Sequence, residues 1–406
     1  MYSSIARPEI PHKLVLMKSC LTLFGLTLFG LTTCLTATSW AQSPEEAEGA
    51  LLGNVRQVTF AGKRAGEGYY NADGTQLVFQ SERDAENPFF QIFVMDLETG
   101  DVEKVSQGHG KTTCAWMHPK GEKVLYASTH EDPRARDKQK EELEFRESGT
   151  ERHYSWDYDE TYDIFASSLD GKTIANLTKT KGYDAEGSYS PDGEWVAFAS
   201  NRHAYTAELS KKEKARFEID KSFLMEIYRM RADGSEVQRL TSVNGYDGGP
   251  FFNSNGSKIC WRRFNEGGDK AEIWTMDADG SNQKQITKLG AMSWAPFFHP
   301  SGDYLIFATN LHGFGNFELY LVDAAGTKKP VRVTHTDGFD GLPAFSPDGE
   351  QLSWTSNRTP NKTSQLFFAE WNHESALELL NSHATNDFSD STAPITVADS
   401  TVIQRV

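Results

Sequence analysis

The sequence predicts an all-β protein, a six-bladed β-propeller of four-stranded blades with short helical insertions in blades 2 and 3. Three observations predict it. A turn motif occurs six times, in which an aromatic residue or methionine is followed by glycine and then by alternating apolar residues. A pair of short apolar strands around a second turn follows most copies. Copies without an insertion between them lie 46 or 47 residues apart, a length that suits four short strands and their turns.

The turn motif defines the start of each blade. Its clearest copy, Phe345–Gly349, reads Phe-Ser-Pro-Asp-Gly. Proline presets φ in such a turn, and glycine accepts the positive φ needed to enter the next strand. We name the four strands of a blade a to d, with this turn between a and b. A four-stranded sheet cannot cover its own faces, so we expect the blades to stack around an axis. The six motif glycines are Gly74, Gly121, Gly193, Gly256, Gly302 and Gly349.

The first 41 residues have the pattern of a signal peptide. Lys18 precedes the apolar stretch 20–35, and Ser39–Ala41 is a small-x-small cleavage pattern. We expect cleavage near Ala41 and a periplasmic or secreted protein without a stable membrane span. An uncleaved anchor and a lipoprotein modified at Cys34 remain alternatives.

The rest of the chain divides into three parts by composition. We expect a linker at 42–54, the propeller at 55–380 and a flexible tail at 381–406. Residues 55–59 resemble a strand d without a blade of its own, which predicts that they close the ring with the last blade. Residues 376–380 compete for that place.

The net charge limits the classes of partner, and the number of cysteines limits the possible disulfides. Without residues 1–41 the chain has 38 basic and 56 acidic residues, a net charge of −18. Nucleic acid is excluded as a partner on this ground, because phosphate binding needs clustered Lys and Arg. Cations, sugars or basic protein surfaces fit better. Cys114 and Cys260 lie in different repeats, so we expect buried thiols and no disulfide framework.

Several repeated motifs resemble those of a known family. Phe-Ser-Pro-Asp-Gly, the Ser-Asn-Arg of residues 200–202 and 356–358, and the Ile-Tyr-x-Met of residues 227–230 are similar to TolB-type (PD40) propeller repeats. The resemblance covers 55–380 and implies the fold. TolB proteins carry an N-terminal α/β domain that engages the Tol machinery; 42–54 is too short for one, so we do not expect a complete Tol role. No Gly-x-Ser-x-Gly elbow of a serine hydrolase occurs.

Loop topology predicts one functional face. The b–c loops and the d–a connections must share an end of the strands, and both long insertions, 129–162 and 203–225, fall in b–c loops. Aromatic residues mixed with carboxylates suit protein or carbohydrate recognition. The predicted binding residues are Tyr154, Trp156, Asp157, Tyr158 and Asp159 in the first insertion, and Tyr183, Asp184, Glu186, Tyr246, Asp247, Trp294, Phe339 and Asp340 in the d–a connections.

Three hypotheses of function follow from these patterns. The first is a non-catalytic module that binds a protein or glycan through this face, with no cofactor. The second is a metal-dependent polysaccharide lyase or hydrolase at the channel mouth, with Asp184, Asp247 and Asp340 around a hard cation such as Ca²⁺. Against it, each Asp could simply cap its own loop. The third is a structural adaptor.

Overall fold

The computed structural model describes residues 43–150 and 158–382, and within them the strands form antiparallel groups of four. The first two groups are β2 (Arg64–Tyr70), β3 (Gln76–Glu82), β4 (Gln91–Asp96) and β5 (Val102–Lys104), then β6 (Thr112–Met117), β7 (Lys123–Ser128), β8 (Asp163–Ser168) and β9 (Ile174–Asn176). The next two are β10 (Asp184–Tyr189), β11 (Trp195–Ser200), β12 (Leu224–Arg231) and β13 (Gln238–Arg239), then β14 (Gly245–Phe252), β15 (Lys258–Phe264), β16 (Ala271–Asp277) and β17 (Lys284–Gln285). The last two are β18 (Ser293–Phe298), β19 (Tyr304–Thr309), β20 (Glu318–Asp323) and β21 (Val331–Arg332), then β22 (Asp340–Phe345), β23 (Gln351–Ser356), β24 (Gln365–Trp371) and β1 (Leu52–Gln57).

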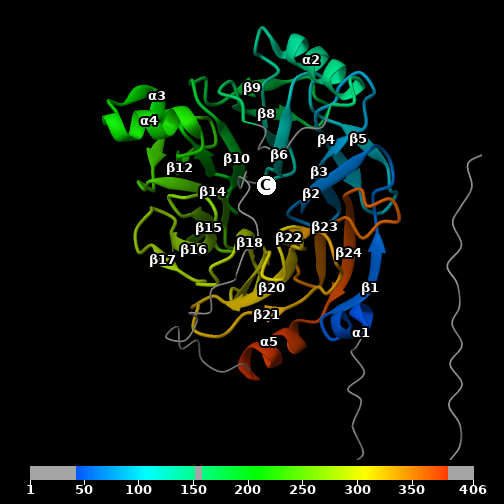
Figure 1. Cartoon of the computed structure of the whole chain (residues 1–406). Helices are drawn as coiled ribbons and strands as arrows, with labels where there is room; N and C mark the ends of the chain where they lie inside the picture. Colours follow the sequence, from blue (N-terminus) through cyan, green and yellow to red (C-terminus); the bar gives the residue numbers. More distant parts are fainter. Residues whose placement is uncertain (1–42, 151–157, 383–406) are drawn as a thin grey trace, which may run out of the picture. The chain divides into compact units, whose positions relative to one another are not determined.

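These groups are arranged around a common axis, as Figure 1 shows. The innermost strands, β2, β6, β10, β14, β18 and β22, each contact the next one, and β22 contacts β2. The prediction of an all-β propeller is therefore confirmed. The third and fourth groups are joined into one sheet by a two-residue parallel pairing of β12 with β14. The described strands thus count as five sheets, or as six antiparallel groups.

The middle strands of the groups are buried on both faces, because each sheet packs between two neighbours. All six residues of β19 and of β20 are buried, including Glu318 and Asp323, so the predicted alternation does not hold in these two strands. Trp261 and Trp354 are the largest fully buried side chains.

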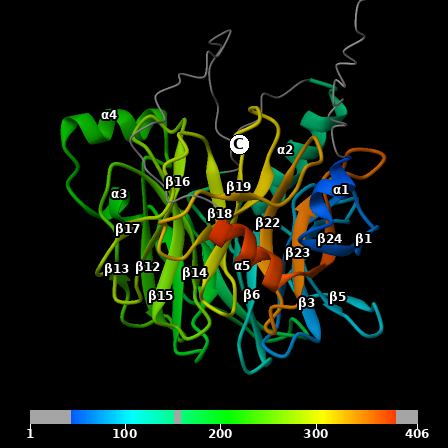
Figure 2. The ribbon, with the colours of Figure 1, turned by 90° about the horizontal axis from the view of Figure 1, so that it is seen from below.

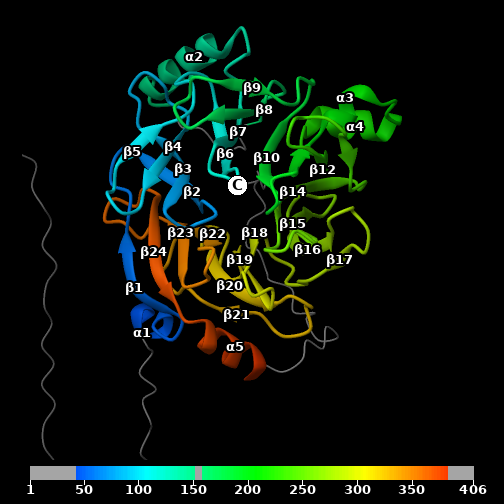
Figure 3. The same cartoon turned by 180° about the vertical axis from the view of Figure 1, so that it is seen from behind.

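An N-terminal strand closes the ring. β1 pairs with β24, with Leu52 opposite Trp371 and Gln57 opposite Phe367. The alternative that residues 376–380 close it is wrong, because they belong to helix α5 (His373–Ser382), which packs against β20 (Figure 3). Helix α1 (Pro44–Glu48), capped by Ser43, precedes β1 within the segment predicted to be a linker.

Both insertions contain helices, as predicted. The first holds α2 (Ala135–Glu147), and the second holds α3 (Arg202–Thr206) and α4 (Lys211–Ile219). They touch through the hydroxyls of Tyr158 and Tyr205, 2.7 Å apart, and α2 and α4 lie toward the same end of the strands in Figure 2. Among the described helices, none is long and apolar enough to cross a membrane.

Candidate functional site

A cavity of about 1190 Å³ lies among the innermost strands and is lined by residues of many sheets. Its walls come from the inner strands and the d–a connections, and the first insertion contributes Lys138 and Phe145 of α2. It is larger than most small-molecule sites. The loop topology predicted this end of the strands as the functional face.

The inner strands share a bulge that aims one residue of each into this cavity. The pairing of every inner strand with its neighbour shifts register at the same place. A β-bulge bends the strand and redirects a side chain. One residue at each bulge has a positive φ of 46° to 62° and lines the cavity. We call these six the bulge ring: Glu67, Cys114, Glu186, Gly249, Ala295 and Leu342.

One side of the bulge ring carries a network of charged and polar groups. Glu186 Oε1 accepts hydrogen bonds from Tyr246 Oη at 2.6 Å and from Arg262 Nη2 at 2.7 Å. Its Oε2 accepts one from the Gly249 amide at 2.5 Å. Gly249 leaves room for this network, because a Cβ there would lie 2.5 Å from Arg262 Nη1. Burial alone would lower the pKa of Arg262, but the charge and hydrogen bond of Glu186, together with Tyr246 and Tyr183, outweigh burial and raise that pKa.

Glu67 is a second carboxylate of the bulge ring, and in the described part of the chain no ion pair joins it to a cation, because the nearby Arg262 is paired with Glu186. Burial raises the pKa of Glu67 to about 7; the nearby Glu186 charge raises it further, and a hydrogen bond with Cys114 lowers it in part. Burial and both carboxylates raise the pKa of the Cys114 thiol well above its usual value. Cys114 is therefore a protonated thiol at the cavity wall, which is a poor nucleophile.

Four aromatic rings pack against one another, each two residues beyond a member of the bulge ring. The ring centroids of Tyr69 and Trp116 are 5.0 Å apart, those of Tyr69 and Phe251 are 5.4 Å apart, and those of Phe251 and Phe297 are 5.5 Å apart. We call these four residues the aromatic floor. Tyr69 and Phe251 face the cavity.

Charged side chains at the mouth pair with one another. Lys138 of α2 lies 2.7 Å from both Asp132 and Asp159, and Lys111 lies 3.7 Å from Asp159. Arg146 of α2 bonds Glu82 at 2.6 Å and so ties the first insertion to the edge of the first group of strands. The mouth is therefore held in place by ion pairs.

The structure brings many predicted binding residues together at the cavity. Those that line it are Tyr158, Asp159, Tyr183, Glu186, Tyr246, Trp294 and Phe339. Trp294 Nε1 is buried and has no hydrogen-bond partner among the described residues. Tyr154, Trp156 and Asp157 lie outside the described residues.

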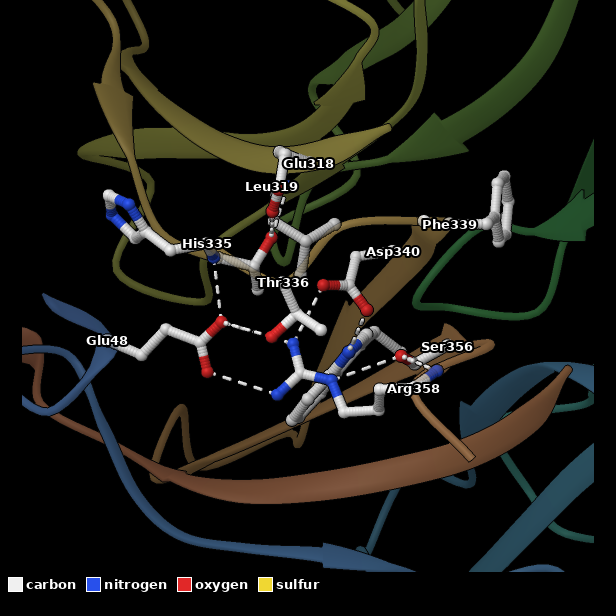
Figure 4. Close-up of polar contacts among 12 residues, drawn as sticks. Glu48, Glu318, Leu319, His335, Thr336, Phe339, Asp340, Ser356 and Arg358 are labelled. Atoms are coloured by element: carbon white, nitrogen blue, oxygen red, sulfur yellow. Dashed lines mark hydrogen bonds and ion pairs between the residues drawn. The ribbon is translucent and has the colours of Figure 1, made fainter. Parts of the chain in front are cut away.

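Asp184, Asp247 and Asp340 lie elsewhere, in three separate groups of strands. Each is buried and pairs at 2.7 Å with an arginine at or just past the end of strand b: Asp184 with Arg202, Asp247 with Arg263, and Asp340 with Arg358. None of the three lines the cavity. Their carboxylates bond arginine side chains rather than capping their own loops. Figure 4 shows Arg358 between Asp340 and Glu48 of α1. In the described ranges, no three or more His, Cys, Asp or Glu residues are placed to hold a metal ion.

Comparison with known proteins agrees with this architecture. Residues 226–398 match the family model PD40, described as the TolB beta propeller domain. The structure of a putative TolB from Agrobacterium tumefaciens superposes with a TM-score of 0.52, at 18% identity, over 79% of this chain and 99% of that one. The chain has a TolB-like β-propeller fold.

Two curated relatives match parts of this TolB-like chain. An uncharacterized protein, Atu1656, of Agrobacterium fabrum is 30% identical over 101 residues, which are 25% of this chain and 28% of that protein. The uncharacterized peptidase YuxL of Bacillus subtilis is 27% identical over 152 residues, 35% of this chain and 23% of that one. The chain thus spans about a quarter of the length of these relatives.

Most residues that line the cavity were not predicted, and three of them belong to its buried charged and polar groups: Glu67, Cys114 and Arg262. The sequence could have identified Glu67 and Cys114, because every member of the bulge ring lies seven residues before a motif glycine. Glu186 had been singled out, and the same spacing in the other repeats leads to Glu67 and Cys114. Arg262 lies on strand b, and nothing in the repeat marks it.

Proposed function

We propose that this protein is an exported recognition module that binds a protein partner and takes a segment of that partner into the cavity. The observation that carries the proposal is the cavity itself. It is lined by charged groups, Glu67, Glu186 and Arg262, and by aromatic rings such as Tyr69 and Phe251, and residues of both insertions and of the d–a connections contribute to it. A volume of about 1190 Å³ suits a peptide segment or an oligosaccharide better than a small metabolite.

Exposed apolar residues around the mouth favour a protein over a glycan. Phe60, Ile219 and Phe314 are 74%, 80% and 57% exposed. Phe60 lies in a d–a connection, and Ile219 and Phe314 lie in b–c loops, so all three belong to the end of the strands where the cavity opens. Single exposed apolar side chains are common on protein surfaces, but three of them at one end of the strands give a large partner several apolar contacts at once.

The experiment compares two sets of substitutions of exposed apolar residues. The rim variant carries Phe60→Ser, Ile219→Ser and Phe314→Ser. The control carries Val55→Ser in β1 and Val237→Ser in a c–d turn at the opposite end. A partner captured from envelope extract is identified and purified, and its affinity for each protein is measured by calorimetry.

The rim variant should bind at least about tenfold more weakly, since each buried phenylalanine contributes about 1.5 kcal/mol or more. The control should bind as the unaltered protein does. Equal affinity of both variants, or capture of glycan alone, contradicts the proposal.

A metal-dependent lyase or hydrolase is the less favoured function. The three aspartates predicted to hold its cation are paired with arginines. Glu67 and Glu186 are the carboxylates that the bulge ring directs into the cavity, and Glu186 already binds Arg262.

A further inference from the structure

We propose that the bottom of the cavity is a binding site for an ammonium group, held between the Glu67 carboxylate and the aromatic floor. The inference deepens the proposed function, on which it rests, by naming the group that the partner's segment presents: a lysine side chain or a free amino terminus.

The charges at the bottom of the cavity are not balanced. Three charged side chains meet there: Glu67, Glu186 and Arg262. Arg262 is committed to Glu186, at 2.7 Å, and to the hydroxyl of Tyr246. With Glu67 ionised, the group carries one net negative charge in a site largely removed from water, where an unpaired carboxylate is costly. One added cation neutralises it.

The aromatic floor selects the kind of cation. Tyr69 lies two residues beyond Glu67 on β2 and, like Phe251, faces the cavity. Ring faces attract ammonium groups, and Tyr69 and Phe251 pack as neighbours at 5.4 Å. A metal ion would need several oxygen ligands, whereas an ammonium group on an aliphatic stem needs one carboxylate and apolar walls. Ala295 and Leu342, on the other side of the bulge ring, supply such walls.

The positions of Glu67 and Glu186 are set by the fold rather than by chance contact. Both have a positive φ, 51° and 57°, which costs a non-glycine residue free energy. The bulge aims their side chains at the axis. Cys114 occupies the bulge position between them, in the second group of strands, and adds no charge because its pKa is raised.

Binding should depend on pH through Glu67. The titratable groups that face it are Cys114, Glu186, Tyr69 and Arg262, and Tyr246 bonds its neighbour Glu186. Burial raises the pKa of the thiol and of both phenols, and Arg262 keeps its charge. The pKa of Glu67 is raised to about 7, and an ammonium group binds only its ionised form. Affinity should therefore rise about tenfold from about pH 6 to about pH 8.

The test uses n-butylammonium as the probe and 1-butanol as its uncharged analogue, with dissociation constants from saturation-transfer NMR on the purified protein. The unaltered protein should bind the amine at least about tenfold more tightly than the alcohol and show the rise with pH. Glu67→Gln should abolish both the preference and the pH dependence, and Glu67→Asp should keep the pH dependence. Glu141→Gln, at a mouth carboxylate that is 62% exposed, is the matched control and should change neither.

Outcomes separate this inference from the proposed function. If Glu141→Gln weakens amine binding as much as Glu67→Gln, or if amine and alcohol bind alike, the floor site is wrong while the rim experiment stands. If Glu67→Gln loses the amine but no protein partner is captured through the rim, the partner is wrong and the ammonium site stands.

Discussion

Buried carboxylates have two different surroundings in this molecule. Asp184, Asp247 and Asp340 each face an arginine within the same group of strands, so their charges hold strand a to the end of strand b. Glu67 forms no ion pair within the described residues, and the nearby Arg262 is paired with Glu186. The same residue type thus stabilises the sheets at one set of positions and remains available to a ligand at another.

Removing the arginine of a buried pair should be costly. Asp247 is 0% exposed, and Arg263→Ala leaves its carboxylate unpaired. We expect a loss of about 3 to 5 kcal/mol in the free energy of unfolding. Lys172→Ala, which breaks the exposed pair with Asp170, should change it by less than about 0.5 kcal/mol. Urea unfolding measures both, and equal losses would contradict a structural role for the buried pairs.

Glu67 should make the protein less stable as pH rises. Its pKa is about 7 in the folded chain, against an ordinary value of 4.5, so between these values the folded state binds more protons than the unfolded state. The stability that this group contributes is present below about pH 4.5 and is lost as pH rises through 7. Glu67→Gln has no such loss. Its stability relative to the unaltered protein should therefore improve by on the order of 2 kcal/mol from about pH 5 to about pH 8, measured by urea unfolding at each pH.

At the scale of single strands, the bulge is the feature that converts a repeated sheet into a site. Each inner strand is bent at the same place, and one residue of each points to the axis. Positive φ disfavours any residue with a Cβ, yet five of the six positions are not glycine. The strained residues are those that line the cavity, and strained backbone is often found at functional sites.

Two alanine-to-glycine changes in the fifth group test this strain. Ala295 of β18 has a φ of 46°, and Ala308 of β19 is a fully buried residue opposite Trp294. Ala295→Gly relieves about 1 to 2 kcal/mol of left-handed strain and loses about 0.5 to 1 kcal/mol in chain entropy, so stability should stay equal or rise. Ala308→Gly relieves nothing and should lose at least about 0.5 kcal/mol. Thermal unfolding measures the stability of both variants. Equal losses of stability would show that the bulge is unstrained.

Sequence repeats predicted these strands because turn glycines and apolar runs are local properties. Phe345–Gly349 is recognisable from its own residues, and so is the shared end of the b–c loops. The partner of Asp340 was not predictable in the same way, because Arg358 becomes its neighbour only when strands a and b pair. The environment of Glu67 depends on residues from other groups of strands, Glu186 and Arg262, whose approach no local pattern encodes.

For the whole molecule, closure of the ring depends on the two ends of the described chain. β1 supplies the outermost strand of the last group. Glu48 of α1 is 3% exposed and forms an ion pair with Arg358 at 3.0 Å. It also accepts a hydrogen bond from the His335 amide at 2.7 Å. Thr59 Oγ1 donates to Gln365 at 2.7 Å, across 306 residues of sequence. These contacts tie the first and last strands of the ring together.

Removing residues 43–60 should open the ring. The variant loses the β1–β24 pairing and the Glu48 contacts, and it exposes the edge of β24, which invites association with other chains. We expect a lower unfolding temperature and oligomers in gel filtration. A synthetic peptide of residues 43–60 added in trans should restore both, since it carries Glu48, β1 and Thr59. The same peptide with Val58→Pro lacks the amide that donates to the Leu366 carbonyl at 2.8 Å and should restore less. Equal rescue by both peptides, or a shortened protein as stable as the whole, would show that the ring is held by the contacts between its sheets alone.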